Sequence, residues 1–253
     1  LTFELFPNTA IVTTHSLDAL VTDSAAAATA IATGYKTNNG MISMLPAGAV
    51  LPTILEALQD AGKATGMVVT NTVYDATPAS FGSHWNTRGG SPFIAAQLLE
   101  RNLDVLLGGG RDQFRPTGVE DGKRTDGRNL MTEAAAAGYS VVTDRQGLES
   151  APDSKILGLF HPSYMNYQLD RIFLGTAEPT LAEMTAKALS VLKADDDGFF
   201  LLIEGSRIDH AAHAGDIGGM VAEIADFDDA VALAHRFAAE NGDTLVIVTA
   251  DHD

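Results

Sequence analysis

The sequence contains no cysteine, which removes disulfide bonds and thiolate metal sites from consideration. Any metal ion bound here would therefore take oxygen and imidazole ligands. Basic residues are also scarce, because 16 Lys and Arg stand against 33 Asp and Glu, for a net charge of −17. Nucleic-acid-binding surfaces carry a basic stripe, so this balance argues against such a surface, whereas an excess of carboxylates suits cation binding.

Long apolar runs are absent as well. No window reaches the roughly 18 uninterrupted apolar residues that a membrane-spanning helix requires. The first residues, LTFELFPNTA, lack the basic start and apolar block of a signal peptide. The 253 residues, 45% of them hydrophobic, suffice for one α/β domain with a substantial core. We expect residues 1–253 to form that domain and to be a truncated part of a longer protein.

Apolar runs alternate with amphipathic stretches, which predicts a mostly parallel central sheet with helices on both faces. The expected strands are Ala10–Thr14, Thr65–Thr70, Asp104–Leu107, Ser140–Val142, Ile156–Phe160, Phe199–Ile203 and Thr244–Thr249. The expected helices are Ser24–Thr33, Thr53–Ala61, Pro92–Arg101, Leu130–Ala137, Thr180–Ala194 and Met220–Glu240. The runs FFLLI and TLVIVTA lack polar alternation, which predicts strands buried on both faces. The polar, Gly-rich stretch between Gly108 and Arg128 predicts a surface loop.

Asp23 and Ser24 stand directly before the run AAAATA. Alanine is the best helix former, and Asp and Ser favour helix starts, where a side-chain oxygen accepts from a free backbone N–H. One interpretation is therefore a plain N-cap. The other is that Ser24, at the positive end of a helix, is a nucleophile placed beside phosphate.

Polar side chains follow three of the expected strands, where ligands bind in open α/β sheets. Glu204 follows FFLLI, Asp251 and His252 follow TLVIVTA, and Asp75 and Thr77 follow VVTNTV. One acid in such a position is ordinarily a turn or cap residue, but three strands that deliver such groups to one edge indicate a site. Thr77 also precedes a proline, which makes it a candidate N-cap.

Asp209 and His213 are four residues apart, so a helix would place both on one face. The alternative is an exposed ion pair without function. Asp251 and His252 are adjacent and can share an ion only where the strand ends. A carboxylate with an imidazole suits zinc, whereas sites that offer only oxygen suit magnesium. The planar fork of Arg88 matches two phosphate oxygens, although a lone arginine is more often a surface residue.

Four segments together resemble the alkaline phosphatases, the metal-dependent phosphomonoesterases. They are TDSAAAATA, YDATPASFGSHWNTR, FFLLIEGSRIDHAAHAGD and TADHD, and they occur in the family's order over nearly the whole chain. The resemblance implies hydrolysis of phosphate monoesters to inorganic phosphate, with two zinc ions and one magnesium ion. It also implies a homodimer exported to the periplasm or the medium.

The resemblance further implies a role for each matching position. Ser24 would be the nucleophile that forms a phosphoserine, Arg88 would clamp the phosphate, and Asp75 would orient Arg88 or a magnesium-bound water. Asp23 and His210 would lie beside the substrate, His210 acting on phosphate through water. The implied metal ligands are Asp251 and His252 for one zinc ion, Asp209 and His213 for the other, and Thr77 and Glu204 for magnesium.

Two ligands of the family have no match in this sequence: an Asp on a strand before the serine segment and a zinc-binding His beyond TADHD. We therefore expect this polypeptide to bind metal poorly and to be weakly active or inactive, and the full-length parent protein to be active.

Two alternatives stay open. A phosphodiesterase or sulfatase on the same fold would share the metal-bound hydroxyl nucleophile. An acidic calcium-binding domain would explain the charge, but the sequence has no D-x-D-x-D-G loop.

Overall fold

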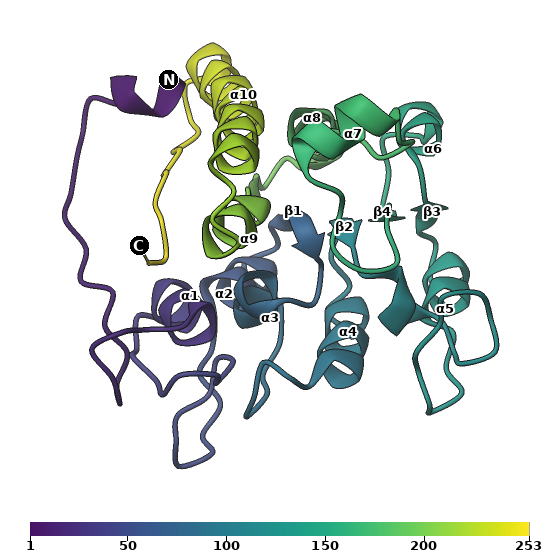
Figure 1. Ribbon diagram of the computed structural model, residues 1–253, viewed down its shortest axis with the longest axis horizontal. Helices are drawn as coiled ribbons and strands as arrows, with labels where there is room; N and C mark the ends of the chain where they lie inside the picture. Colours follow the sequence, from purple (N-terminus) through teal and green to yellow (C-terminus); the bar gives the residue numbers. More distant parts are fainter. Residues whose placement is uncertain (253) are drawn as a thin grey trace.

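A computed structural model describes residues 1–252, which are organised around a five-stranded sheet (Figure 1). Every strand pair in it is parallel, and the order is β3-β4-β2-β1-β5. The central strand β1 is buried along its whole length, as expected for a strand with helices on both faces. The bounds are β1 Ala64–Thr72, β2 Val105–Gly109, β3 Ser140–Val142, β4 Ile156–Leu159 and β5 Phe199–Glu204.

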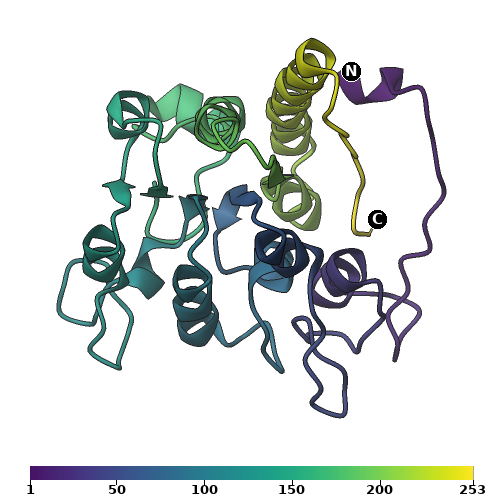
Figure 2. The same ribbon diagram turned by 180° about the vertical axis from the view of Figure 1, so that it is seen from behind.

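Helices cover both faces of the sheet, with α1–α5 on one side and α6–α8 and α10 on the other (Figures 1 and 2). Leu55, Ile94 and Leu130 belong to the core cluster of the first side, and Leu148 and Met184 to that of the second. The bounds are α1 Ser24–Thr33, α2 Ile54–Asp60, α3 Ala76–Gly82, α4 Ser91–Glu100, α5 Leu130–Ala136, α6 Arg145–Ser150, α7 Gln168–Leu174, α8 Leu181–Leu192, α9 Arg207–His213 and α10 Ile217–Asn241. Two short 3₁₀ helices span Thr2–Leu5 and Arg111–Phe114.

The predicted α/β architecture is confirmed, and all six expected helices and five expected strands are present within a few residues of their predicted ends. Helix α1 has the predicted bounds because Asp23 caps it: its carboxylate accepts from the Ala26 N–H at 3.0 Å. The helix ends at Gly34, which has φ 77°. Among residues 1–252, no helix has both the length and the apolar character needed to cross a bilayer.

Two expected strands are wrong. Residues 10–14 and 244–249 have extended, irregular backbone and pair with no strand among the described residues. A strand needs a neighbour for its backbone groups, and apolar pattern alone does not supply one. Several of their large side chains are accordingly exposed, with Ile11 at 99% and Leu245 at 82%.

Two further expectations need correction. Strand β5 is half-buried instead of buried, because it is the last strand of the sheet and has a strand neighbour on one side only. The stretch from Gly108 to Arg128 is only partly a surface loop. Phe114 and Arg124 within it are buried, and Arg124 donates to the carbonyls of Pro92 and Gln113.

Candidate active site

The first residue of α1 meets the end of the chain. Ser24 Oγ lies 3.0 Å from Nε2 of His252. Both views show the C-terminal segment running down past α9 to end beside α1 (Figures 1 and 2). Asp251 Oδ2 is 3.4 Å from the same imidazole nitrogen, so the three side chains converge although the segment is not a strand. In a continuous strand, Asp251 and His252 would point to opposite faces and could not share an ion. The backbone here is irregular, so both side chains can lie on the same side.

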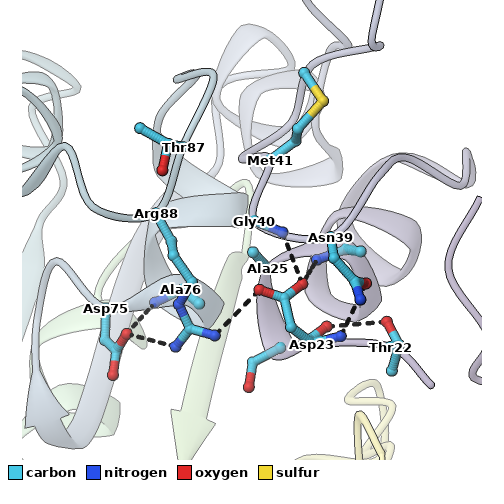
Figure 3. Close-up of polar contacts among 12 residues, drawn as sticks. Thr22, Asp23, Ala25, Asn39, Gly40, Met41, Asp75, Ala76, Thr87 and Arg88 are labelled. Carbon is cyan, nitrogen blue, oxygen red and sulfur yellow. Dashed lines mark hydrogen bonds and ion pairs between the residues drawn. The ribbon is translucent and has the colours of Figure 1, made fainter. Parts of the chain in front are cut away.

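Arg88 bridges two carboxylates across the neighbouring helix starts (Figure 3). Its Nη1 is 3.3 Å from Asp23 Oδ2 and its Nη2 is 3.0 Å from Asp75 Oδ1. Burial opposes ionisation, yet the attraction of Asp75 and then of Asp23 raises the pKa of Arg88. These two bonds use two of the five guanidinium N–H groups, so Arg88 keeps donors for an anion.

The two aspartates are themselves fixed by the backbone. Asp23 Oδ1 accepts from the N–H groups of Ala26 and Gly40, and the Asn39 side chain accepts from the Asp23 N–H (Figure 3). Asp75 accepts from the Ala76 N–H at 2.7 Å and caps α3. The N-cap of this helix is thus Asp75 and not Thr77, because the helix begins two residues earlier than the proline suggested.

Asn71 is a residue that the sequence analysis missed. Its side-chain amide hydrogen-bonds to Asp75 Oδ2 from the end of β1. An asparagine inside an apolar run (VVTNTV) was the available signal.

Glu204 presents a carboxyl oxygen that the protein leaves unpaired. The residue as a whole is half-buried, but its Oε2 is shielded from solvent and has no hydrogen-bond partner. Burial raises its pKa to about 8, with Asp75 and Asp251 contributing in the same direction and the nearby hydroxyls of Ser206 and Thr77 opposing it. A charged carboxylate is costly in such a place unless a cation accompanies it.

Asp209 and His213 lie on one face of α9, as their spacing predicted. Asp209 Oδ1 is 3.3 Å from His213 Nε2, and the side chains are 41% and 78% exposed. Within residues 1–252 no hydrogen bond or ion pair joins them to Ser24 or Arg88. His210 lies between them in sequence, and burial lowers its pKa, with Arg207 acting in the same direction and Asp75 opposing.

The donor chemistry fits divalent cations, although the shells are incomplete in the described residues. No group of three or more His, Asp or Glu in residues 1–252 is placed to hold an ion. The side chains gather instead as two carboxylate–imidazole pairs and one orphaned carboxyl oxygen. Two ligands of one tetrahedral zinc ion lie about 3.3 Å apart, and the nitrogen–oxygen distances in the two pairs are 3.3 Å and 3.4 Å. Zinc therefore suits these pairs, and magnesium suits the oxygens beside Glu204.

The solved structures that are similar to this chain are alkaline phosphatases. Thermus thermophilus alkaline phosphatase superposes with a TM-score of 0.91 at 39% identity, covering 95% of this chain and 50% of that one. The alkaline phosphatase of the Antarctic bacterium TAB5 gives 0.89 at 31% identity, covering 100% and 71%.

The curated proteins with similar sequences are phosphatases as well. Alkaline phosphatase 3 of Bacillus subtilis is 44% identical over 239 residues, which cover 92% of this chain and 49% of the relative. Streptomycin-6-phosphate phosphatase of Streptomyces griseus is 40% identical, covering 95% and 64%. The chain spans about half the length of the first curated relatives it matches. The family model for alkaline phosphatase matches residues 1–253, and the chain therefore belongs to the alkaline phosphatase family.

Proposed function

We propose that this protein hydrolyses phosphate monoesters through a phosphoserine on Ser24. The observation that carries the proposal is the contact of Ser24 Oγ with His252 Nε2, 3.0 Å apart, at the N-terminus of α1. Neither residue is needed to stabilise that helix end, since Asp23 caps it.

The reaction needs positive charge around a phosphoryl group and an activated hydroxyl. Uncatalysed hydrolysis of phosphate monoesters is so slow that enzymes accelerate it by up to ~10²¹-fold. Arg88, held by Asp23 and Asp75, would donate its remaining N–H groups to two phosphoryl oxygens. The positive end of α1 would add to this field.

Ser24 Oγ would attack phosphorus while the ester oxygen leaves with the alcohol, and water would then cleave the phosphoserine to release inorganic phosphate. A serine hydroxyl is a weak nucleophile at neutral pH, and His252 Nε2 is placed to take its proton or to share a cation with it. Bound divalent cations would supply the positive charge that makes hydroxyl groups acidic and offsets the charge of the phosphoryl oxygens.

The proposed cation ligands follow the pairs in the structure. Two zinc ions would be held at Asp251 with His252 and at Asp209 with His213, and one magnesium ion at Glu204 with Thr77. The orphaned Oε2 of Glu204 supports the third site. A variant of the TAB5 alkaline phosphatase has been solved with Mg bound in its M3 site. Assembly as a homodimer and location in the periplasm or medium are proposals that rest on family membership.

The decisive experiment compares p-nitrophenyl phosphate with bis(p-nitrophenyl) phosphate and p-nitrophenyl sulfate, using both this polypeptide and its full-length parent supplied with zinc and magnesium. We expect preference for the monoester, complete loss in Ser24→Ala, and phosphate trapped on Ser24 after acid quenching. Ser150→Ala, which alters an exposed serine on α6, is the matched control and keeps full activity. Preference for the diester or the sulfate would overturn the proposal in favour of a related hydrolase.

A further inference from the structure

Arg207 and the ring of Tyr164 both contact His210, and Tyr167 in turn packs on Arg207. Arg207 Nη1 lies 2.6 Å from His210 Nδ1, and the guanidinium carbon of Arg207 lies 3.7 Å from the centre of the Tyr167 ring. The ring of Tyr164 lies 4.7 Å from that of His210 at an interplanar angle of 55°. We call Arg207, Tyr164 and Tyr167 the Arg207 clamp.

The position of Arg207 is itself fixed from two sides. Its backbone N–H donates to Thr70 Oγ1 of β1 at 3.2 Å, which ties the start of α9 to the central strand. Tyr167 directly precedes α7, and Arg171 of that helix is joined to Asp226 of α10 at 2.8 Å. The backbone of Arg207 is thus tied to β1, and its guanidinium is held by His210 and by the rings of Tyr164 and Tyr167.

Arginine has only donors, so a hydrogen bond from its Nη1 requires His210 Nδ1 to be the acceptor. A neutral imidazole that accepts at Nδ1 carries its proton at Nε2. Nε2 lies across the ring from Nδ1 and therefore points away from Arg207. Asp75, which holds Arg88, is close enough to act electrostatically on His210.

We propose that Arg207 is a positioning residue that fixes His210 in the tautomer with the proton on Nε2, so that Nε2–H is presented to phosphate or to a water bound to it. The second half of this statement rests on the proposed function. The first half concerns the chain alone and is tested without turnover.

The tautomer is read by long-range ¹H–¹⁵N NMR of ¹⁵N-histidine-labelled protein at a pH where the imidazole is neutral, with the His210 signals assigned by their loss in His210→Gln. We expect the protonated nitrogen to be Nε2 in the unaltered protein. Arg207→Met keeps an unbranched apolar side chain but removes the donors, so its His210 shifts move toward a mixture of tautomers. Arg145→Met, which alters an exposed arginine on α6, leaves them unchanged. A proton on Nδ1 in the unaltered protein, or unchanged shifts in Arg207→Met, would overturn the assignment.

The coupling to ligand is measured by calorimetric binding of inorganic phosphate to metal-supplied protein. Loss of one hydrogen bond to a charged group corresponds to a rise of about tenfold in Kd, which we expect for both Arg207→Met and His210→Ala. The double variant should bind no more weakly than His210→Ala, because Arg207 acts through that ring. Additive losses would overturn the positioning role.

Arg207→Lys keeps a donor and should restore part of the affinity for phosphate.

If Arg207→Met fails to fold, Tyr167→Leu is the substitute, because it removes the ring on which the guanidinium packs and should shift the same His210 signals. Unchanged His210 signals in Tyr167→Leu would equally refute the role of the Arg207 clamp. Full-length parent protein that is supplied with zinc and magnesium and neither binds phosphate nor cleaves a monoester would refute the proposed function, and the NMR result would still decide the tautomer.

Discussion

Ser24 Oγ and His252 Nε2 lie 3.0 Å apart although 228 positions separate them in the chain. The distance is that of a hydrogen bond, and it also suits two ligands of one cation. Both arrangements need the imidazole, and under the proposed function either would make the Ser24 hydroxyl a better nucleophile.

His252→Ala should therefore lower kcat by about 10²–10⁴-fold, the range attributed to a positioned proton acceptor. The measurement is p-nitrophenyl phosphate hydrolysis by protein supplied with zinc and magnesium. His15→Ala changes an exposed histidine and serves as the control. A His252→Ala variant that keeps more than a tenth of the activity would show that the contact with Ser24 has no role in the reaction.

Arg88→Lys tests the guanidinium fork. Arg88 donates to Asp23 and Asp75 at once, and a single ammonium group cannot hold both and also bind two phosphoryl oxygens. Loss of hydrogen bonds between charged groups weakens binding by about 10- to 100-fold. We therefore expect KM and the phosphate inhibition constant to rise by that factor, with a smaller change in kcat. Arg236→Lys, on the exposed side of α10, is the matched control. Equal phosphate inhibition of both variants would contradict the clamp role of Arg88.

The sequence predicted best those features that depend on neighbours along the chain. Helix α1 follows from an N-cap aspartate and a run of alanines, and the meeting of Asp209 with His213 follows from helical spacing. Features that depend on distant partners were predicted poorly. Residues 244–249 have the composition of a buried strand, but a strand forms only where another strand offers its edge.

The same limit applies within the site. The resemblance placed Arg88 and Asp23 near phosphate and gave Asp75 as a residue that orients Arg88 or a magnesium-bound water, but it gave no sign that the same guanidinium also contacts Asp23. Nor could it reveal the Arg207 clamp, because Tyr167 and Arg207 lie 40 positions apart and meet only in the folded chain, where α7 and α9 each pack on α10. Contacts of this kind depend on tertiary packing, which local pattern does not encode.

The buried ion pair between Arg171 and Asp226 should matter more for stability than the exposed pairs. The two side chains are 2% and 3% exposed and lie 2.8 Å apart, and Arg171 Nη1 also donates to the Pro179 carbonyl. Asp226→Ala leaves the buried guanidinium of Arg171 without its negative partner and should lower the free energy of unfolding by about 3–5 kcal/mol. Arg145→Ala, which breaks an exposed pair with Glu183, should cost less than about 1 kcal/mol. Urea unfolding measures the change in stability for both variants. Equal losses of stability would contradict the claim that burial makes the Arg171–Asp226 pair more important than the exposed pair.

Glu204 should give the metal-free protein a distinctive dependence of stability on pH. Its pKa is about 8 in the folded protein, against an ordinary value of 4.5. Between these two pH values the folded state holds a proton that the unfolded state has released. The contribution of Glu204 is therefore fully present below about pH 4.5 and is lost as the pH rises through about 8.

Glu204→Gln keeps the shape of the side chain and never ionises, so its stability does not fall in this way as the pH rises. Measured by urea unfolding with a chelator, the variant should gain on the unaltered protein between pH 5 and pH 8.5, by at most about 1.4 kcal/mol per unit of pKa shift. Adding Mg²⁺ at pH 8.5 should then stabilise the unaltered protein and leave Glu204→Gln unmoved, because only an ionised Oε2 attracts the cation. Glu149→Gln, which changes an exposed glutamate on α6, is the control and should track the unaltered protein at every pH above 6. Parallel curves for Glu204→Gln and the unaltered protein would mean that this carboxyl is ionised at low cost, and the case for a cation beside it would fail.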